Sequence, residues 1–386
     1  WICEKIYGEG TMIRYLEKSE FGACRPLWQE AFPEDSREFA DYYFDKKILQ
    51  SSVLVKEDGT GRIVTMAHMN PYRINVGKKM WKLDYIVGVA TAADSRHRGH
   101  MRDVLMRMLG DMHQDRKPFC YLMPASPDIY RPFGFRYIFD QPRYRLGPEA
   151  KERLRRRELR LDGNLCSPLA GWINHWLSSR FQVYALRDRD YMEMLQSELD
   201  SEAGSVYGWY DGTGALQAFQ SFWGREKREQ RFLYAGRDEW LEPDSGQYPP
   251  RPAIMARITD VRSFMEAIVL DEGCPCPAMD VMVNIHDTLI PGNSGLWRWK
   301  IDGNGSSLTK RGLTLSEVHA GECAEEPDYP GTLVSTEVLD ITIEQLASWL
   351  FGYSVLEELA DGQQNVVPFW CAYVQALDGV YLDEVV

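Results

Sequence analysis

The sequence predicts an α+β protein of three domains, and three observations lead to this prediction. The chain has 386 residues, whereas single domains usually span roughly 100–200 residues. Two segments have the composition of domain boundaries: the basic run 151–160, and the segment 241–252, which is rich in Pro. Strand and helix patterns are mixed on both sides of each boundary. We therefore expect domains at residues 12–150, 151–250 and 251–386.

In the first domain, short apolar runs and turn residues predict a sheet with helices. Strand patterns are found at residues 12–16, 51–55, 63–69 and 83–91. The segment Glu57 to Gly61 contains Asp58-Gly59, a turn signal that would join two of these strands into a hairpin. Residues 27–43 carry apolar side chains at helical spacing. The last run is almost continuously apolar, as expected for a strand buried on both faces.

The other two domains show the same mixture of elements. In the second domain, strand patterns lie at residues 181–185, 205–210, 216–223 and 232–235. In the third domain we expect a strand at 254–258, a helix at 262–268 and a late helix at 343–351. The basic run 151–160 is expected to be a charged surface helix that links domains, in preference to a binding patch. We expect no exact internal repeat.

Composition narrows the classes of function. The formal net charge is −13, which argues against a nucleic-acid partner because nucleic-acid binders concentrate Lys and Arg. The negative charge suits a cationic substrate, although it also serves solubility alone. No apolar run approaches the ~18–20 residues of a membrane helix, and residues 1–11 do not resemble a signal peptide. The sequence thus predicts a cytoplasmic protein without a membrane partner.

The eight cysteines are mostly scattered singly along the chain. A zinc site requires Cys pairs at short spacing or Cys/His clusters, and neither occurs. We therefore expect no metal and assign the cysteines as reduced, mostly buried side chains.

The segment from Asp84 to Met112 carries the clearest chemical signal. It reads as a buried strand, a basic turn and an amphipathic helix with apolar residues at Met101, Val104, Leu105, Met108, Leu109 and Met112. Free backbone amides at a helix start favour an anion, and Gly99 lets the backbone come close to it. Arg96 and Arg98 add positive charge. The turn is suited to a pyrophosphate, although basic turns also open many surface helices.

A second strand pattern, Phe119 to Pro124, follows this helix, and Ile129-Tyr130-Arg131-Pro132-Phe133-Gly134-Phe135 comes next. Strand, R-x-x-G turn, helix, strand and a following Tyr resemble the GNAT superfamily of N-acetyltransferases. Met101 stands where that superfamily usually has Gly or Ala. The runs Gly88 to Arg102 and Ile129 to Phe135 are similar to the enhanced-intracellular-survival (Eis) family within it.

This resemblance covers residues 12–386 and is weak between 147 and 252. It implies tandem GNAT-like domains, the second without coenzyme A, followed by a sterol-carrier-protein-like α+β domain. The segments Ile254 to Val261 and Val380 to Val386 resemble the start and the end of that third domain.

The resemblance also implies roles for particular residues. Backbone groups of Val89, Ala90 and Thr91 would contact the pantetheine arm of acetyl-coenzyme A. The pyrophosphate would be held by Arg96, His97, Arg98, Gly99, His100 and Met101. Tyr130 would be the general acid and the terminal carboxylate of Val386 the general base. From the residues alone, Tyr130 is also consistent with a packed core aromatic, and Val386 with a frayed terminus.

The acceptor pocket would be bordered by the early helices. Its candidate residues are Trp28, Phe32, Glu34, Asp35, Phe39 and Tyr43. Aromatic rings beside carboxylates suit an amine through cation–π and ionic contacts. The same residues also fit a core-facing stripe with an acidic, solvated end.

The resemblance therefore predicts an acetyl-coenzyme A-dependent N-acetyltransferase that acts by direct transfer. Its acceptors would be primary amines on aminoglycosides, on polyamine-like molecules or on lysine side chains, and its assembly a hexamer. The alternative from another class is a non-catalytic binding protein that holds an apolar ligand in the third domain and keeps a vestigial coenzyme A turn. The intact turn at Arg96 to Gly99 together with Tyr130 favours the enzyme.

Overall fold

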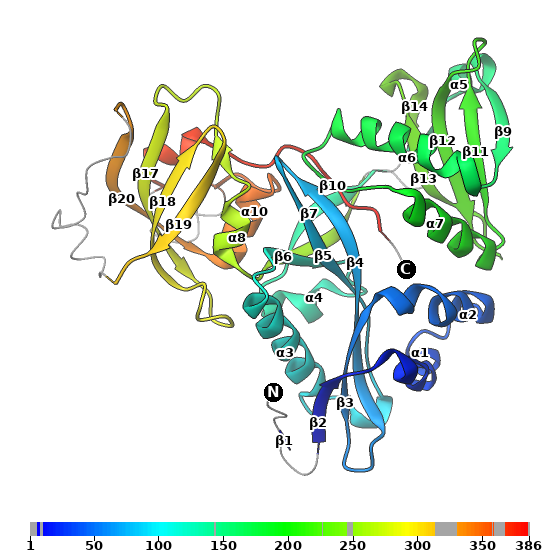
Figure 1. Ribbon diagram of the computed structural model, residues 1–386, viewed down its shortest axis with the longest axis horizontal. Coiled ribbons are helices and arrows are strands. Elements are labelled where there is room, and N and C mark those ends of the chain that lie inside the picture. Colours follow the sequence, from blue (N-terminus) through cyan, green and yellow to red (C-terminus); the bar gives the residue numbers. More distant parts are fainter. Residues whose placement is uncertain are drawn as a thin grey trace.

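Apolar strands of the first domain build one large sheet at the centre of the computed structural model (Figure 1). The structure describes residues 6–7, 11–142, 144–225, 227–244, 250–312, 330–356, 358 and 367–384. The strands of the first domain are β1 (Ile6–Tyr7), β2 (Thr11–Tyr15), β3 (Ser52–Glu57), β4 (Ile63–Val76), β5 (Lys79–Thr91), β6 (Phe119–Leu122) and β7 (Arg136–Gln141). The strands at 51–55, 63–69 and 83–91 are present as β3, β4 and β5, the last two longer than predicted.

Three strands of this sheet come from far along the chain, and two of them, β10 (Val183–Ala185) and β22 (Val380–Tyr381), join it at β4. The sheet order is β1-β2-β3-β4-β5-β6-β15-β7, and β15 (Arg251–Ile258) lies antiparallel between β6 and β7. The sequence pattern predicted a strand at 254–258 and assigned it to the start of the third domain. Its apolar run suits any sheet that buries both faces, so the pattern does not reveal which sheet receives it.

Helices cover both faces of the sheet. On one face lies the amphipathic α3 (His100–Gln114), which buries Val104, Leu105, Met108, Leu109 and Met112 as the spacing predicted. On the other face lie α1 (Arg25–Ala31) and α2 (Arg37–Asp45), which share an aromatic cluster with β3 and β4 (Figure 1). The short helices are η1 (Lys18–Cys24), η2 (Lys47–Gln50), η3 (Ala93–Ser95), α4 (Pro127–Tyr130) and η4 (Arg131–Phe133).

The second domain has its own sheet, ordered β13-β12-β11-β9, with two helices packed on it. Its elements are α5 (Pro148–Arg153), β9 (Arg155–Leu159), α6 (Gly163–Ser178), β10 (Val183–Ala185), α7 (Arg189–Ser201), β11 (Ser205–Tyr210), β12 (Leu216–Trp223), β13 (Glu229–Ala235) and η5 (Asp238–Trp240). A small antiparallel pair, β8 (Tyr144–Leu146) with β14 (Leu241–Pro243), flanks it. Among the described residues, no helix is long and apolar enough to span a membrane.

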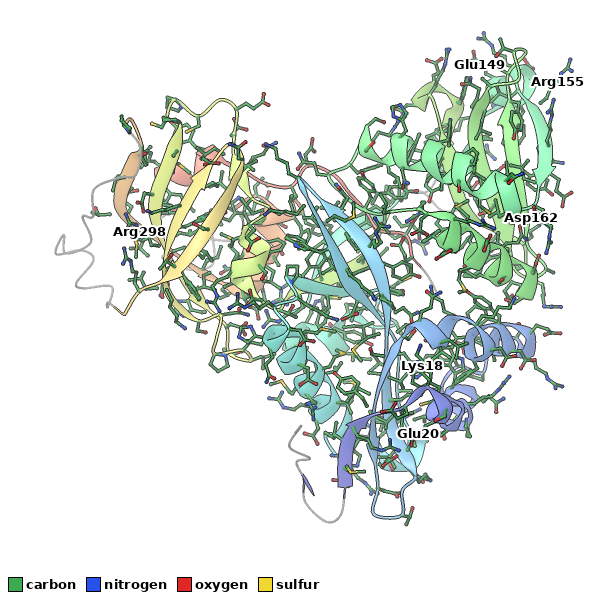
Figure 2. All side chains as sticks on the ribbon, in the orientation of Figure 1. Lys18, Glu20, Glu149, Arg155, Asp162 and Arg298 are labelled. Atoms are coloured by element: carbon green, nitrogen blue, oxygen red, sulfur yellow. The ribbon has the colours of Figure 1, made fainter. Side chains whose placement is uncertain are left out.

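The basic run does not form the single helix that we expected. Residues 151–153 form the end of α5, whereas Arg155–Leu159 forms strand β9. β9 pairs with β11, and Leu159 lies opposite Val206. Figure 2 shows Arg155 at the outer margin of this sheet. Charge alone predicts exposure, whereas the strand depends on a partner about fifty residues later in the chain.

The two sheets contain the same four-residue turn, although the strands on either side of it do not repeat in sequence. Asp58-Gly59-Thr60-Gly61 joins β3 to β4, and Asp211-Gly212-Thr213-Gly214 joins β11 to β12. In the first turn Asp58 Oδ1 accepts from the amide and hydroxyl of Thr60 at 2.9 and 2.6 Å. In the second, Asp211 Oδ1 accepts the same two bonds from Thr213 at 2.8 and 2.6 Å. The strand orders β2-β3-β4-β5 and β9-β11-β12-β13 also correspond, which supports a tandem arrangement.

The third domain packs helices against a sheet ordered β19-β18-β17-β20. Its core includes Trp297, Trp299 and Trp370, all essentially inaccessible to solvent. Its elements are α8 (Val261–Met265), β16 (Val269–Leu270), β17 (Ala278–His286), β18 (Gly295–Asp302), β19 (Gly305–Lys310), β20 (Leu333–Thr342), α10 (Ile343–Leu350), η6 (Phe369–Tyr373) and β21 (Val374–Gln375). The late helix begins where the sequence predicted.

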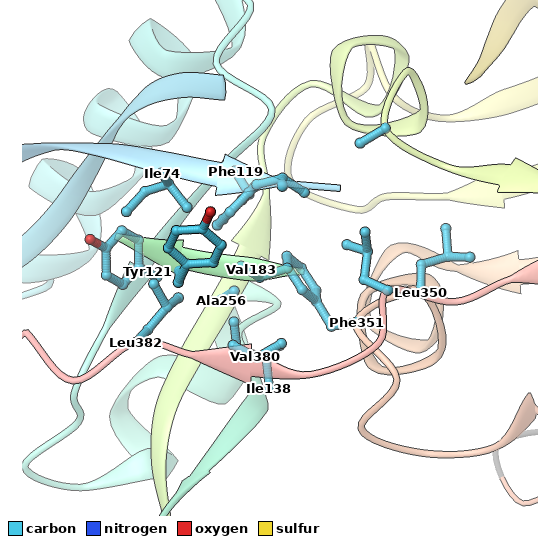
Figure 3. Packing of buried hydrophobic residues seen from close by; sticks show 14 of the residues in the cluster. Ile74, Phe119, Tyr121, Ile138, Val183, Ala256, Leu350, Phe351, Val380 and Leu382 are labelled. Carbon is cyan, nitrogen blue, oxygen red and sulfur yellow. The ribbon is translucent and has the colours of Figure 1, made fainter. Parts of the chain in front are cut away.

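The chain returns at its end to join the other domains. β22 (Val380–Tyr381) pairs in parallel with β10, and β10 pairs with the end of β4 at Ile74–Val76. The cluster around this junction contains apolar residues from all three domains, and Figure 3 shows Val183, Val380 and Leu382 within it. This junction joins apolar residues of the three domains in one shared cluster.

Beside β22, a buried ionic cluster holds the final described residues in place. Arg187 donates to Asp383 Oδ1 at 2.8 Å and to Glu384 Oε1 at 2.7 Å, and all three side chains are inaccessible to solvent. Arg231 donates to the carbonyl oxygen of Asp383 at 2.7 Å and to Glu198 at 3.0 Å. Burial raises the pKa of Asp383 and Glu384, and the Arg187 charge opposes that shift.

Replacing Arg187 with Leu is expected to destabilise the protein strongly. It leaves two buried carboxylates without their cation, and breaking a buried pair in this way costs about 3–5 kcal/mol. Arg189→Leu is the matched control, because it removes an exposed i,i+4 pair with Glu193 worth about 0.3–0.5 kcal/mol. The measurement is the midpoint of denaturant unfolding; equal midpoints for the two variants would contradict the buried cluster.

Candidate active site

The candidate site lies where two parallel strands of the central sheet separate. β5 and β6 are paired only at Tyr85 and Tyr121. Beyond Tyr85, β5 continues to Thr91 and pairs with β4 alone. The backbone N–H and C=O groups on the other edge of β5 are thus left without a strand partner and remain available to a ligand. Val89, Ala90 and Thr91, the predicted pantetheine contacts, lie on this stretch.

A bulge interrupts β5 at the start of the unpaired stretch. Val87 faces His68 and Ala90 faces Met66, so Gly88 and Val89 together oppose one residue of β4. Gly88 has φ of 60°, and a Cβ there would come within 2.7 Å of the Trp28 ring. Only glycine meets both demands. A lone Gly inside an apolar strand is the usual sequence signal of such a bulge, and we did not predict one here.

At the far end of β5, a basic turn leads into α3. Gly99 precedes the helix with φ of 81°, and no side chain caps the first helical amides. The amides of His100, Met101 and Arg102 have no acceptor within the helix, because a helix leaves its first turn unpaired. The helix dipole adds positive potential at the same place, so the turn is suited to an anion.

The other residues of this basic turn directly precede the start of α3 in the chain. Arg96 Nε donates to the carbonyl oxygen of Thr91 at 3.1 Å, which folds the turn back on β5. The side chains of Arg96, His97 and Arg98 are exposed, and His97 has a positive φ of 62°. Such a conformation is costly for a residue with a side chain and often occurs at ligand sites. Burial, together with the charge of Lys56, lowers the pKa of His100.

Tyr130 lies on the other side of the strand separation. It is 8% exposed and belongs to the cluster that contains Leu122 of β6, with Val89 and Met101 at its margin. Its ring meets Phe135 edge-on at 5.8 Å, and its hydroxyl has no hydrogen bond to any described residue. Burial raises the pKa of Tyr130 to about 12, so the phenol keeps its proton at neutral pH.

The predicted acceptor residues are partly brought together by the early helices. Trp28 is buried next to Gly88, stacks on Tyr43 at 4.4 Å and lies 4.9 Å from Phe32. Its Nε1 donates to Asp35 Oδ2 at 2.8 Å. Burial raises the pKa of Asp35 to about 6, and the Trp28 hydrogen bond limits that shift. This carboxyl group therefore changes charge close to neutral pH.

The remaining acceptor candidates have different surroundings. Phe39 is 4% exposed and lies 5.9 Å from Tyr42 within the aromatic cluster, while the Glu34 side chain is exposed. The packing of Phe39 matches the core-stripe alternative. Trp28, Phe32 and Asp35 form one connected group beside β5.

Two buried polar residues of β4 were missed by the sequence analysis. Tyr43 Oη and His68 Nδ1 are 3.0 Å apart, and Asn70 Oδ1 accepts from Ser51 Oγ at 2.6 Å. His68 Nε2 and Asn70 Nδ2 have no partner among the described residues. Burial lowers the pKa of His68 to about 3, so its ring is neutral. Their one sequence signal is a pair of polar residues, His68 and Asn70, at alternating positions of an apolar strand.

Val386, the predicted general base, lies outside the described residues. Glu384 is the nearest described residue to it, and Glu384 Oε2 is buried without a partner among the described residues. No group of three or more His, Cys, Asp or Glu side chains in the described part of the chain is arranged to hold a metal ion. The expectation of no metal stays a prediction.

Comparison with known families assigns a class to this arrangement of strand, turn, helix and tyrosine. Residues 12–138 match the family model described as an acetyltransferase (GNAT) domain. This part of the chain is therefore a GNAT N-acetyltransferase domain, and the predicted class of enzyme is confirmed. No curated protein matches the chain.

Solved structures extend the likeness to the whole chain at the level of fold. A GCN5-related N-acetyltransferase from Kribbella flavida is 15% identical, with a TM-score of 0.69, and the match covers 98% of this chain and 100% of that one. One from Anabaena variabilis is 14% identical, with a TM-score of 0.70 and coverage of 96% and 99%. Eis1 from Mycobacterium abscessus is 15% identical, with a TM-score of 0.65 and coverage of 96% and 99%. The predicted likeness to the Eis family is thus present in the fold.

Gly99→Asp is expected to abolish binding of coenzyme A and to leave the fold intact. A Cβ at this position meets no atom within 4 Å, and Asp is among the side chains that best tolerate the left-handed φ of 81°, at some cost in stability. The new carboxylate would occupy the anion site and repel a pyrophosphate. Gly110→Asp, on the same helix and equally free of contacts at Cβ, is the control and should bind normally. Calorimetric titration measures the affinity of both variants for acetyl-coenzyme A. Unchanged affinity in a folded Gly99→Asp variant would show that the turn does not bind the pyrophosphate.

Proposed function

We propose that the protein transfers the acetyl group of acetyl-coenzyme A directly to a primary amine. The observation that carries this proposal is the unpaired edge of β5, which runs from the Gly88 bulge to the basic start of α3. A ligand with an extended arm and a pyrophosphate fits both ends of this stretch. Tyr130 and the Trp28 group lie on opposite sides of it.

The binding of acetyl-coenzyme A follows from these contacts. The pyrophosphate would accept hydrogen bonds from the free amides at the start of α3 and from Arg96 and Arg98. The pantetheine arm carries amides, which would pair with backbone groups of Val89 to Thr91 in place of a neighbouring strand. Arg96 donates a hydrogen bond to Thr91, so the residues proposed for the pyrophosphate and for the pantetheine arm are in contact.

The chemistry requires two proton transfers. The neutral amine attacks the thioester carbonyl carbon, the C–N bond forms, and the C–S bond breaks to release coenzyme A. Its sulfur takes a proton from Tyr130, and the amine nitrogen loses one to a base. A phenol with a pKa near 12 stays protonated at neutral pH and donates its proton to the sulfur while the C–S bond breaks; solvent then reprotonates the phenolate.

We assign the base to the terminal carboxylate of Val386, as the resemblance implies. The support is its neighbourhood: Glu384, two residues earlier, is buried and held by Arg187. A free α-carboxylate is a weak base (reference pKa ~3.3–3.7), so this role requires the bound substrates to exclude water from it.

The acceptor would be a primary amine on an aminoglycoside, on a polyamine-like molecule or on a lysine side chain. Trp28 and Phe32 supply aromatic faces, and Asp35 supplies a carboxyl group. The net charge of −13 favours approach of a cation. By the same resemblance we propose a cytoplasmic hexamer, a second GNAT-like domain without coenzyme A, and a sterol-carrier-like third domain.

Tyr130→Phe is expected to lower kcat by about 10²–10⁴-fold, the usual contribution of a general acid. Affinity for acetyl-coenzyme A should stay close to that of the unchanged protein, because only one hydroxyl is lost. The assay is thiol release from acetyl-coenzyme A with a panel of amines. Tyr137→Phe, a tyrosine of the neighbouring strand β7, is the control and should keep full activity. Retained activity with lowered stability in Tyr130→Phe would place Tyr130 in the core alone.

Adding two glycines after Val386 is expected to reduce turnover far more than thermal stability. Termini usually tolerate additions, but extra residues would move a catalytic carboxylate and fill the pocket. A tag ahead of Trp1 is the control and should be harmless. If the C-terminal addition leaves kcat unchanged, the base must be another group, for example Asp35.

A further inference from the structure

A second cavity lies in the second domain, apart from the candidate active site. Its volume is about 900 Å³, within the usual range of ~300–1,000 Å³ for small-molecule pockets. It is bounded by β13, by the β8–β14 pair and by the segment from Tyr381 to Asp383. Neither the basic turn Arg96 to Met101 nor Tyr130 lines it. The residues of the proposed acetyl-coenzyme A site therefore do not include the lining of this cavity.

The cavity follows the free edge of β13. Five consecutive residues of that strand, Glu229 to Leu233, line it. Neighbouring residues of a strand point to opposite faces, so a run of five places the cavity along the strand edge. β13 is the outermost strand of its sheet and holds the place that β5 holds among β2 to β5. The sheet of the second domain thus has an open edge at β13, the position that corresponds to the open edge of β5 in the first domain.

Aromatic rings form much of the lining. Trp209 and Phe222 lie on the face of the sheet turned to the cavity, and Trp176 and Phe181 lie beside the strand edge. Gln220 joins two lining residues: its Oε1 accepts from Trp209 Nε1 at 3.2 Å, and its Nε2 donates to Gln230 Oε1 at 2.8 Å. These bonds fix the Trp209 ring, which is 7% exposed, and Phe222 is half-buried, so the edges of both rings border the cavity.

The charges around the cavity favour an anion. Seven lining residues are Arg or Lys and four are Asp or Glu, although the chain as a whole carries −13. Arg156 and Arg228 have no carboxylate partner among the described residues. Arg156 lies 4.6 Å from the Tyr207 ring centre and Arg228 lies 5.5 Å from that of Phe222. Guanidinium groups stacked on rings keep donors for a carboxylate, sulfonate or phosphate.

We propose that this cavity binds a small organic anion with a planar aromatic body. The anionic group meets Arg156 or Arg228, and the flat body lies against Trp209 and Phe222. The site is separate from the acetyl-coenzyme A site, so its occupancy does not depend on the Gly99 turn.

Titration calorimetry with naphthalene-2-sulfonate tests the charge preference of the cavity. Its matched probe is 2-naphthylmethylammonium, which has the same rings and the opposite charge. The sulfonate is expected to bind one equivalent, at least about tenfold more tightly than the ammonium, as one charge-assisted hydrogen bond would give. Equal or tighter binding of the ammonium overturns the proposal.

A double variant of two lining arginines and a control variant of a neighbouring arginine test where the anion binds. Arg156 lines the cavity, whereas Arg157 on the same strand points to the other face and lies 5.0 Å from the Tyr210 ring centre. Arg156→Gln combined with Arg228→Gln should weaken sulfonate binding by about tenfold or more, and Arg157→Gln should leave it unchanged. Acetyl-coenzyme A affinity, measured on each variant, reports that the fold is intact. Equal sulfonate affinity in both variants would show that the anion binds elsewhere.

Discussion

The divergence of β5 from β6 is the constraint on which the rest of the site depends. Because the two strands pair only at Tyr85 and Tyr121, β5 carries an open edge from Ile86 to Thr91. The Gly88 bulge turns the strand against Trp28, and the basic turn after Thr91 places the start of α3 at the end of that edge. A fully paired β5 would leave no backbone groups for an extended ligand.

Buried arginines connect this site to distant parts of the chain. Arg257 of β15 donates to both oxygens of Asp287 at 2.7 Å. Gly134, four residues after Tyr130, has φ of 79° and lies so close to Arg257 that a Cβ would be 2.8 Å from its Nε. The turn that follows Tyr130 is therefore packed on β15, a strand that comes after the second domain in the chain. Arg187 fixes the segment at Asp383 and Glu384 in the same way.

Local sequence patterns predicted much of the site. The features that they did not predict depend on pairing between segments far apart in the chain. The helical period of α3, the glycine before it and the near-continuous apolar run of β5 are all visible within a few residues of sequence. The position of β15 in the first sheet, the β9 strand within a basic run and the partners of Arg187 depend on residues far away in the chain. The repeated Asp-Gly-Thr-Gly turn was visible in the sequence, and the structure shows its meaning by placing it between corresponding strands.

A crystal structure of the complex with coenzyme A tests directly whether the ligand binds along the open edge of β5. We expect the pyrophosphate at the amides of His100 and Met101, the pantetheine arm along Val89 to Thr91, and the thiol within hydrogen-bonding distance of Tyr130 Oη. Coenzyme A bound away from the β5 edge, or with its thiol remote from Tyr130, would contradict this expectation.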